Sequence, residues 1–317
     1  MANHCTKSVR LTQTAWISLV YSVLFVCATT RAQDYSISEI PTFGGAASVA
    51  TDINNFGVVC GYAQNSAGQD RALMWSSGVL VALETLGGPN SRAHAINDNA
   101  KIVGEAENSS GALRAVRWQP GFILDLADLG GGTAAAYDIN NNDFVTGWST
   151  VSAGGNHRGF QWSLGGGMTA LSQQGQPGGF FSEGYGINLS RDVAGKGDIG
   201  FPTFNVRAAF WPFGGAMTSI ATQQAGSIAY AVNARDQVVG SAPGFGPFLW
   251  QSGSMSALFG APAGEALDID SSGKIVGWTM LGGVQRAVIW EGLGILDLNE
   301  FASTEFGLGT PTRYSHQ

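Results

Sequence analysis

Oxygen-bearing side chains alternate along three segments of the chain, as they do in calcium-binding loops. The segments read DINNFG (52–57), DINNND (138–143) and DIDSSG (268–273). A calcium loop also needs a later carboxylate to complete the oxygen shell, and none follows these segments at the required distance. Asn, Asp, Ser and Gly are equally typical of tight turns. We therefore predict turns here, and neither a metal site nor a cofactor.

Residues suited to nucleophilic or metal-assisted hydrolysis are sparse and far apart. His94, His157 and His316 are separated by long stretches of chain, and neither a Gly-x-Ser-x-Gly nor a His-Glu-x-x-His motif occurs. Carboxylates are harder to exclude, because acidic residues distant in sequence can meet in the fold. The sequence predicts no particular catalytic residue, and acid–base catalysis by paired carboxylates stays open as an alternative to a non-catalytic role.

Three aromatic residues stand at one equivalent place in a recurring pattern. Tyr62, Trp148 and Trp278 each follow the glycine that ends a short apolar run. Exposed aromatic rings stack on sugar rings and mark binding surfaces, whereas buried ones fill gaps between structural units. We take Tyr62, Trp148 and Trp278 as candidate ligand-binding residues. The other copies carry Glu105, Lys196 and Ser241 at this place.

The recurring pattern is a repeat present in six copies. Each copy contains an Ile/Val-Asn element, a turn, a short apolar run, a segment ending in tryptophan and an apolar tail. Successive tryptophans are 43, 44, 49, 39 and 40 residues apart. We expect them to be structural anchors of the core: Trp75, Trp118, Trp162, Trp211, Trp250 and Trp290.

The composition of each copy favours four short strands. β-Branched runs such as IVG (102–104) suit buried strands, and segments such as NNND (140–143) suit hairpin turns. Four strands in a repeat of about 43 residues are typical of a β-propeller blade. Residues 35–45 and 294–300 both resemble the tail that ends a copy. The all-β fold is therefore a propeller of six blades, or of seven with the last incomplete.

An arginine lies four residues before the tryptophan in five of the copies. Because a residue repeated in every blade usually serves every blade, we expect these arginines to contact the tryptophan or a neighbouring turn rather than a ligand. The arginines are Arg71, Arg114, Arg158, Arg207 and Arg286.

The segments TLGG (85–88), AINDNAKIVG (95–104) and RAVRW (114–118) follow one frame. In this frame, the chain resembles the HAF repeat family of bacterial extracellular proteins over residues 42–298. The name-giving His-Ala-Phe is absent. Arginine replaces the histidine in copies one to four and in copy six, and Gly246 replaces it in copy five. The resemblance implies export and a propeller-like fold, and it implies no activity.

The first 32 residues have the features of a signal peptide. Lys7 and Arg10 precede an apolar core at 17–28, and Thr30-Arg31-Ala32 offers a cleavage site. The apolar run is shorter than the roughly 20 residues that span a bilayer. We therefore expect a secreted protein, extracellular or periplasmic, with a repeat domain at 33–298 and a tail at 299–317 that is either spare or part of a seventh repeat.

Removal of the signal peptide changes the net charge from −7 to −10 and leaves Cys60 as the single cysteine. An acidic chain is a poor partner for nucleic acid or an anionic membrane surface. The leading hypothesis is a non-catalytic binding or scaffold module for an extracellular ligand, either carbohydrate, such as an envelope polysaccharide, or protein. The alternative is a propeller-fold carbohydrate hydrolase or lyase.

Overall fold

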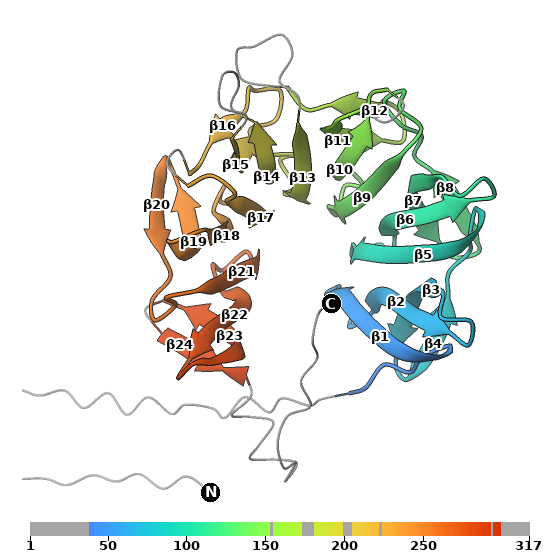
Figure 1. Ribbon diagram of the computed structural model, residues 1–317, viewed down its shortest axis with the longest axis horizontal. Helices are drawn as coiled ribbons and strands as arrows, with labels where there is room; N and C mark the ends of the chain where they lie inside the picture. The colour runs from blue at the N-terminus through green and yellow to red at the C-terminus, as the bar shows by residue number, and fades with distance from the viewer. Residues whose placement is uncertain are drawn as a thin grey trace, which may run out of the picture. The chain divides into compact units, whose positions relative to one another are not determined.

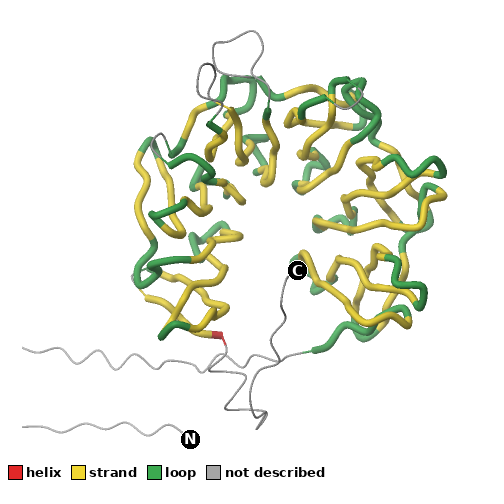
Figure 2. Tube along the Cα trace, viewed as in Figure 1, coloured by secondary structure: helices red, strands yellow, loops and turns green. Residues whose placement is uncertain are grey.

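The computed structural model describes residues 38–152, 155–172, 181–198, 205–221, 224–292 and 294–298. These residues form six four-stranded antiparallel sheets, each built from four consecutive strands of the chain (Figure 1). The sheets surround a central axis as the blades of a β-propeller, which confirms the predicted fold with six blades. Strands and their connecting loops make up nearly all of the described residues (Figure 2). The expected signal peptide (1–32) and the tail (299–317) lie outside them.

Blade one consists of β1 (Gly44–Ile53), β2 (Val59–Asn65), β3 (Asp70–Ser76) and β4 (Val79–Ala82), and blade two of β5 (Gly87–Ile96), β6 (Ile102–Asn108), β7 (Leu113–Gln119) and β8 (Phe122–Asp125). Blade three consists of β9 (Ala134–Ile139), β10 (Val145–Thr150), β11 (His157–Ser163) and β12 (Gly167–Ala170), and blade four of β13 (Ser182–Ile187), β14 (Val193–Asp198), β15 (Val206–Trp211) and β16 (Thr218–Ser219). Blade five consists of β17 (Ile228–Val232), β18 (Val238–Ala242), β19 (Gly246–Gln251) and β20 (Ser254–Ala257), and blade six of β21 (Gly264–Ile269), β22 (Ile275–Leu281), β23 (Val284–Glu291) and β24 (Gly294–Asp297).

The first strand of every blade lies innermost and carries a β-bulge. In blade two the register of β5 against β6 shifts between Ala93 and Ala95, so His94 has no partner across the ladder. The bulge brings the backbone of β5 close to the glycine that ends the apolar run. A Cβ added at Gly104 would lie 2.0 Å from the Arg92 carbonyl oxygen. The same close approach recurs in the other blades and explains why the repeat carries glycine there.

The turn after each inner strand begins with the repeated Asn or Asp. Its side-chain oxygen accepts hydrogen bonds from backbone N–H groups two and four residues later, for example Asn97 from Asn99 and Lys101. The fourth turn residue adopts left-handed backbone, with φ of 54° at Ala100 and 95° at Gly273. These Asx turns explain the predicted Asn, Asp, Ser and Gly clusters.

The hydrophobic core is divided among the junctions between blades. We call the face of a blade toward the next blade in the chain its trailing face, and the opposite face its leading face. Each of five apolar clusters joins the trailing face of one blade to the leading face of the next. Trp118 is fully buried on the leading face of blade two, and its indole N–H donates to the Glu84 carbonyl of the preceding connection at 2.8 Å. Trp211 and Trp290 make the same type of bond to Ser172 and Phe259.

Two expectations for blade one are wrong. Trp75 is only half-buried, because no blade among the described residues precedes blade one to cover its leading face. The segment 35–45 is not a tail strand in its described part. Residues 38–42 form no strand, Phe43 makes an isolated bridge to Asn65, and β1 begins at Gly44.

No helix in the described ranges is long and apolar enough to cross a bilayer.

Candidate functional site

An asparagine ladder joins the blades at the end of the axis where the inner strands finish. The Asn54 side-chain N–H donates to the Asn97 carbonyl of the next blade at 3.1 Å. Asn97, Asn140, Asn188 and Asn233 each make the corresponding bond to the following blade. The ladder ends at Asp270, whose carboxylate has no N–H to donate. These side chains are therefore committed to holding neighbouring blades together.

Calcium is expected to leave the melting temperature unchanged. The Oδ1 atoms of the turn residues already accept backbone N–H groups, as Asp270 does from Ser272 and Lys274. No cluster of three or more His, Cys, Asp or Glu residues in the described ranges is placed to share a metal ion. Thermal unfolding with millimolar calcium and then with chelator tests this expectation, since a ligand that binds the folded state raises the melting temperature. A rise that the chelator reverses would contradict it.

Three aspartates approach the axis above the ladder. Asp52, Asp138 and Asp268 occupy equivalent inner-strand positions in blades one, three and six. Burial raises the pKa of Asp52 to about 6 and that of Asp138 to about 7, and the negative charges of the other axial aspartates add to both shifts. Burial also raises the pKa of Asp268. Carboxylates far apart in sequence thus influence one another electrostatically near the axis.

The oxygens of two of these aspartates bind backbone amides. Asp138 accepts hydrogen bonds from Ile139 of its own blade and Ile187 of the next, both at 2.7 Å. Asp52 accepts from Ile53 and Ile96 in the same way. An open pocket of about 330 Å³ at this end of the axis is lined by Asp138, Asp268 and the turn asparagines. Asp52 and Asp138 therefore link their blades to the next ones, and Asp138 and Asp268 line the pocket.

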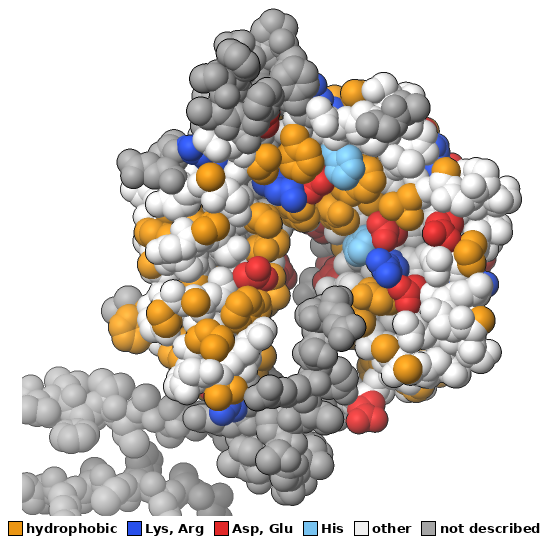
Figure 3. Space-filling model, in the orientation of Figure 1, with side chains coloured by type: hydrophobic (Ala, Val, Ile, Leu, Met, Phe, Trp, Pro, Cys, Tyr) orange, Lys and Arg blue, Asp and Glu red, His pale blue; other side chains and the backbone are white. Residues whose placement is uncertain are grey.

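The opposite end of the axis carries a cluster of charged and aromatic side chains. Figure 3 shows histidine, acidic, basic and hydrophobic groups gathered around the central opening of this face. Glu183 lies at the centre of the cluster. It contacts His157 Nδ1 at 2.6 Å, accepts from the Tyr185 hydroxyl at 2.5 Å and pairs with Lys196 Nζ at 3.0 Å.

Glu183 is held in its ionised form. Burial by itself would raise its pKa, but the hydrogen bonds from Tyr185 and His157 and the charge of Lys196 outweigh burial and lower the pKa. Burial and the hydrogen bond to Glu183 raise the pKa of the Tyr185 hydroxyl, which therefore acts as a neutral donor. The carboxylate of Glu183 is a fixed acceptor at neutral pH.

Stacked rings extend this cluster across blades three and four. Trp148 stacks on His157 with ring centroids 3.7 Å apart, and its indole N–H donates to the Tyr137 hydroxyl at 2.9 Å. Tyr137 in turn stacks on Tyr185 with centroids 5.1 Å apart. Trp148 is only 9% exposed. Its ring is therefore used in packing and positions His157 and Tyr137.

Blades one and two contribute a second charged group to the same face. Arg92 donates two hydrogen bonds to Asp70 and lies over the Tyr62 ring, 5.1 Å from its centroid. His94 Nε2 is 3.6 Å from a Glu105 oxygen and forms no hydrogen bond, although it is buried. One face of the half-buried Tyr62 ring is therefore covered by a cation.

A pocket of about 330 Å³ lies between blades five and six, on the face that carries the charged and aromatic cluster. Tyr230, Ser241 and Glu265 line it. The half-buried Trp278 donates its indole N–H to Glu265 at 3.2 Å. Burial and the Glu265 charge raise the pKa of Tyr230 to about 12. The pocket thus combines a neutral phenol, a hydroxyl and a carboxylate that Trp278 holds in place.

The three candidate aromatics do not form one patch. Tyr62 contacts Arg92 of blade two, Trp148 packs against His157, and Trp278 positions Glu265. Tyr62 and Trp278 belong to blades one and six, which stand on either side of an open sector of the ring (Figure 1). Trp278 contacts Glu265, which lines the pocket between blades five and six.

Residues that the sequence reading missed occupy the bulge position of each inner strand. Tyr137, Tyr185 and Tyr230 stand at this position in three successive blades, and His94 precedes them in blade two. These residues all lie three positions before the repeated Asn, and the residue type at this position varies from copy to copy. That variation is the feature of the sequence that could have identified them. Bulges cannot be located without the register of the partner strand, so the position was not singled out.

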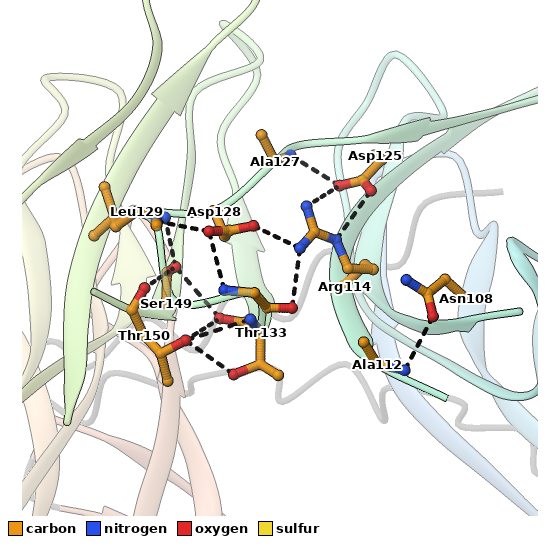
Figure 4. A network of polar contacts seen from close by, with 12 residues as sticks. Asn108, Ala112, Arg114, Asp125, Ala127, Asp128, Leu129, Thr133, Ser149 and Thr150 are labelled. Atoms are coloured by element: carbon orange, nitrogen blue, oxygen red, sulfur yellow. Dashed lines mark hydrogen bonds and ion pairs between the residues drawn. The ribbon is translucent and has the colours of Figure 1, made fainter. Parts of the chain in front are cut away.

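The repeated arginines serve the edges of the blades. Arg114 bonds to Asp125 and Asp128 and to the Gly132 carbonyl, which ties β7 to the connection into blade three (Figure 4). Arg71 reaches the Gly88 carbonyl, and Arg286 pairs with Asp297. Arg114 thus makes the expected contact with a neighbouring connection, whereas Arg71 and Arg286 contact residues of β5 and β24.

Neither a protein-family model nor a curated protein sequence matches the chain. Several solved structures do. One, provisionally described as a gluconolactonase, has a TM-score of 0.39 and 12% identity, and the match covers 70% of this chain and 83% of that one. The lectin of Aleuria aurantia, as a mutant in complex with Fucα1-6GlcNAc, has a TM-score of 0.40 and 14% identity, with coverages of 81% and 96%. AofleA from Arthrobotrys oligospora has a TM-score of 0.35 and 12% identity, with coverages of 79% and 86%.

Proposed function

We propose that the protein is a non-catalytic binding module that takes a polyhydroxylated ligand, such as a sugar unit of an extracellular polysaccharide, between blades five and six. The observation that carries this proposal is the pocket of about 330 Å³ lined by Tyr230, Ser241 and Glu265. Its volume is at the lower end of the range for small-molecule sites.

The chemistry of the lining suits sugar hydroxyls. The Glu265 carboxylate accepts charge-assisted hydrogen bonds, and the Trp278 indole fixes its orientation. Tyr230 offers an aromatic surface and a hydroxyl that stays protonated at neutral pH. The adjoining cluster around Glu183 extends the same mixture of rings and charges toward blade four, which would accommodate further units of a chain. The predicted signal peptide and HAF-like repeat support a secreted location for this role.

Replacing Glu265 with Gln should weaken ligand binding by roughly tenfold to a hundredfold, because a hydrogen bond to a charged group contributes about 1.5–3 kcal/mol. A glycan array probed with the full chain identifies the ligand, and titration calorimetry measures its affinity. Glu291→Gln is the matched control, since Glu291 is an exposed carboxylate of the same blade. Equal affinities for the two variants would contradict the assignment of this pocket.

The axial aspartates favour one second candidate, a carbohydrate hydrolase or lyase. Glycosidases pair a protonated acid with an ionised carboxylate, and the raised pKa of Asp138, which lines an open pocket together with Asp268, suits the acid of such a pair. Incubation of the full chain with each bound polysaccharide, followed by an assay for new reducing ends or unsaturated products, separates the two functions. Binding without product would exclude the enzymatic function. Product that forms with the natural chain and not with Asp138→Asn would exclude a purely non-catalytic binding module.

A further inference from the structure

The trailing face of blade six lacks the cover that the other blades have. Val276 in β22 is 39% exposed. Its equivalents in blades one to five are all 0% exposed: Cys60, Val103, Thr146, Ala194 and Val239. Ala287 in β23 is also exposed, whereas Ala72, Ala115, Gly159, Ala208 and Pro247 at the same position are buried. Half of an inter-blade core is therefore open to solvent in the described structure.

The leading face of blade one shows the complementary defect. Ile53 is 60% exposed, and its equivalents Ile96, Ile139, Ile187, Val232 and Ile269 are 5–8% exposed. Ala50 and half-buried Trp75 lie on the same face. Blades one and six stand on either side of the open sector (Figure 1), so their faces do not cover each other as neighbouring faces do elsewhere. Exposed apolar surface of this kind marks a docking site.

At the other junctions, the positions equivalent to Val276 and Ala287 lie against the inner strand of the following blade, and side chains of its second and third strands complete the cluster. The inner strand of each following blade lies against the second and third strands of the blade before it, as β5 does against β2 and β3, and β21 against β18 and β19. One further inner strand laid against β22 and β23 would therefore cover Val276 and Ala287 without a complete seventh blade.

The sequence after β24 is long enough to supply such a strand. At five junctions it leaves the outermost strand and becomes the next inner strand after a connection of 4 to 11 residues. Twenty residues follow Asp297, the end of β24. They are enough for the longest of these connections and for an inner strand of five residues, the length of β17. Phe306 and Leu308 are spaced so that a strand would direct both to one face.

We infer that residues 299–317 of this chain supply an inner strand that docks on β22 and β23 and covers Val276 and Ala287. The occupant is thus a segment of the same chain and not a second copy. The strand extends the propeller past blade six and protects its apolar face from association with other molecules.

Thiol reactivity at position 276 tests this docking. The full chain carrying Cys5→Ser, Cys27→Ser and Val276→Cys is compared with the same chain ending at Leu298. The rate of labelling by a small maleimide is measured by peptide mass spectrometry, since only an accessible thiol reacts. The introduced thiol should react at least about tenfold more slowly in the full chain, because reaction there requires local opening.

Two controls come from equivalent positions. Cys60 is the natural counterpart of Val276 in blade one and is fully buried, so it should stay slow in both chains. Val239 is the equivalent residue of blade five and is buried against blade six. A thiol introduced by Val239→Cys should therefore also be labelled slowly in both chains. If the shortened chain does not fold, the full chain with Phe306→Asp and Leu308→Asp replaces it, and the thiol at 276 should again become fast.

Three outcomes would overturn the inference. Fast labelling at 276 in both chains means that nothing covers this face. Slow labelling in both means that something other than residues 299–317 covers it. Slow labelling of the full chain that appears only at high protein concentration, together with a doubled mass in light scattering, identifies a second copy as the occupant.

Discussion

Replacing Trp118 with alanine is expected to lower the free energy of unfolding by about 3–5 kcal/mol, the range for large aromatic residues removed from a core. Trp118 is 0% exposed and packs in the cluster between blades one and two with Ile96, Ile102 and Val116. The substitution also removes the indole donor to the Glu84 carbonyl. Both the cavity and the lost hydrogen bond destabilise the folded state.

Trp75→Ala is the matched comparison, because Trp75 occupies the same repeat position in blade one. Its leading face has no blade before it among the described residues, and the residue is half-buried. Its loss should therefore cost less, about 1–2 kcal/mol. Denaturant unfolding followed by tryptophan fluorescence and circular dichroism measures both variants. Equal destabilisation of the two would show that blade one is covered in solution and would contradict the difference between the two sites.

Raising the pH from about 5 to about 8 is expected to destabilise the protein. Burial raises the pKa of Asp52 to about 6 and that of Asp138 to about 7, from an ordinary value of 3.8. Between the ordinary pKa of 3.8 and these raised values, the folded protein binds more protons than the unfolded chain. The free energy of unfolding therefore falls as pH rises. The two groups together should account for about 4 kcal/mol between pH 5 and pH 8.

Other carboxylates act in the opposite direction at lower pH. Hydrogen bonds and nearby cations lower the pKa values of Asp128, Asp270 and Glu183, so their stabilising contribution is lost as pH falls below about 4. Stability should therefore be greatest near pH 5. Melting temperatures measured in buffers of equal ionic strength from pH 3 to pH 9 give this profile.

The Asp138→Asn variant should flatten the profile between pH 5 and pH 8, because the amide does not titrate. The absolute stability of this variant is a poorer readout. The Ile187 N–H donates to one Asp138 oxygen, and an amide NH₂ group at that place cannot accept this hydrogen bond. Asp98→Asn serves as the control, because hydrogen bonds from Asn55 lower the pKa of that exposed carboxylate and it titrates well below this window. An unchanged slope in Asp138→Asn would show that the axial aspartate is ionised throughout.

Local chemistry made most of the fold predictable. The Asx turns, the short β-branched second strands and the tryptophan third strands each depend on residues within one repeat, and the six-blade propeller followed from their period. The glycine before the variable aromatic position was equally regular, and the structure shows its cause in the 2.0 Å approach of the bulged backbone. What repeats in sequence is what every blade needs for its own hairpins and junctions.

The candidate site was much less predictable. Trp148 and Trp278 share a repeat position, yet one stacks on His157 of β11 and the other orients Glu265 of β21, because neighbouring strands carry different residues in the two blades. Trp75 and Trp118 likewise share a position and differ in burial.

The sequence by itself determined the repeat, the strands, the turns and the anchors, since these arise from contacts within about 45 residues of chain. Only the tertiary structure decided which groups meet across the axis. The charge of Asp52 raises the pKa of Asp138 although 86 residues separate them. Whether a face is core or surface depends on the neighbouring blade, as Ile53 and Ile96 show. Burial and electrostatic coupling are properties of the assembled ring, and no single repeat contains the information that sets them.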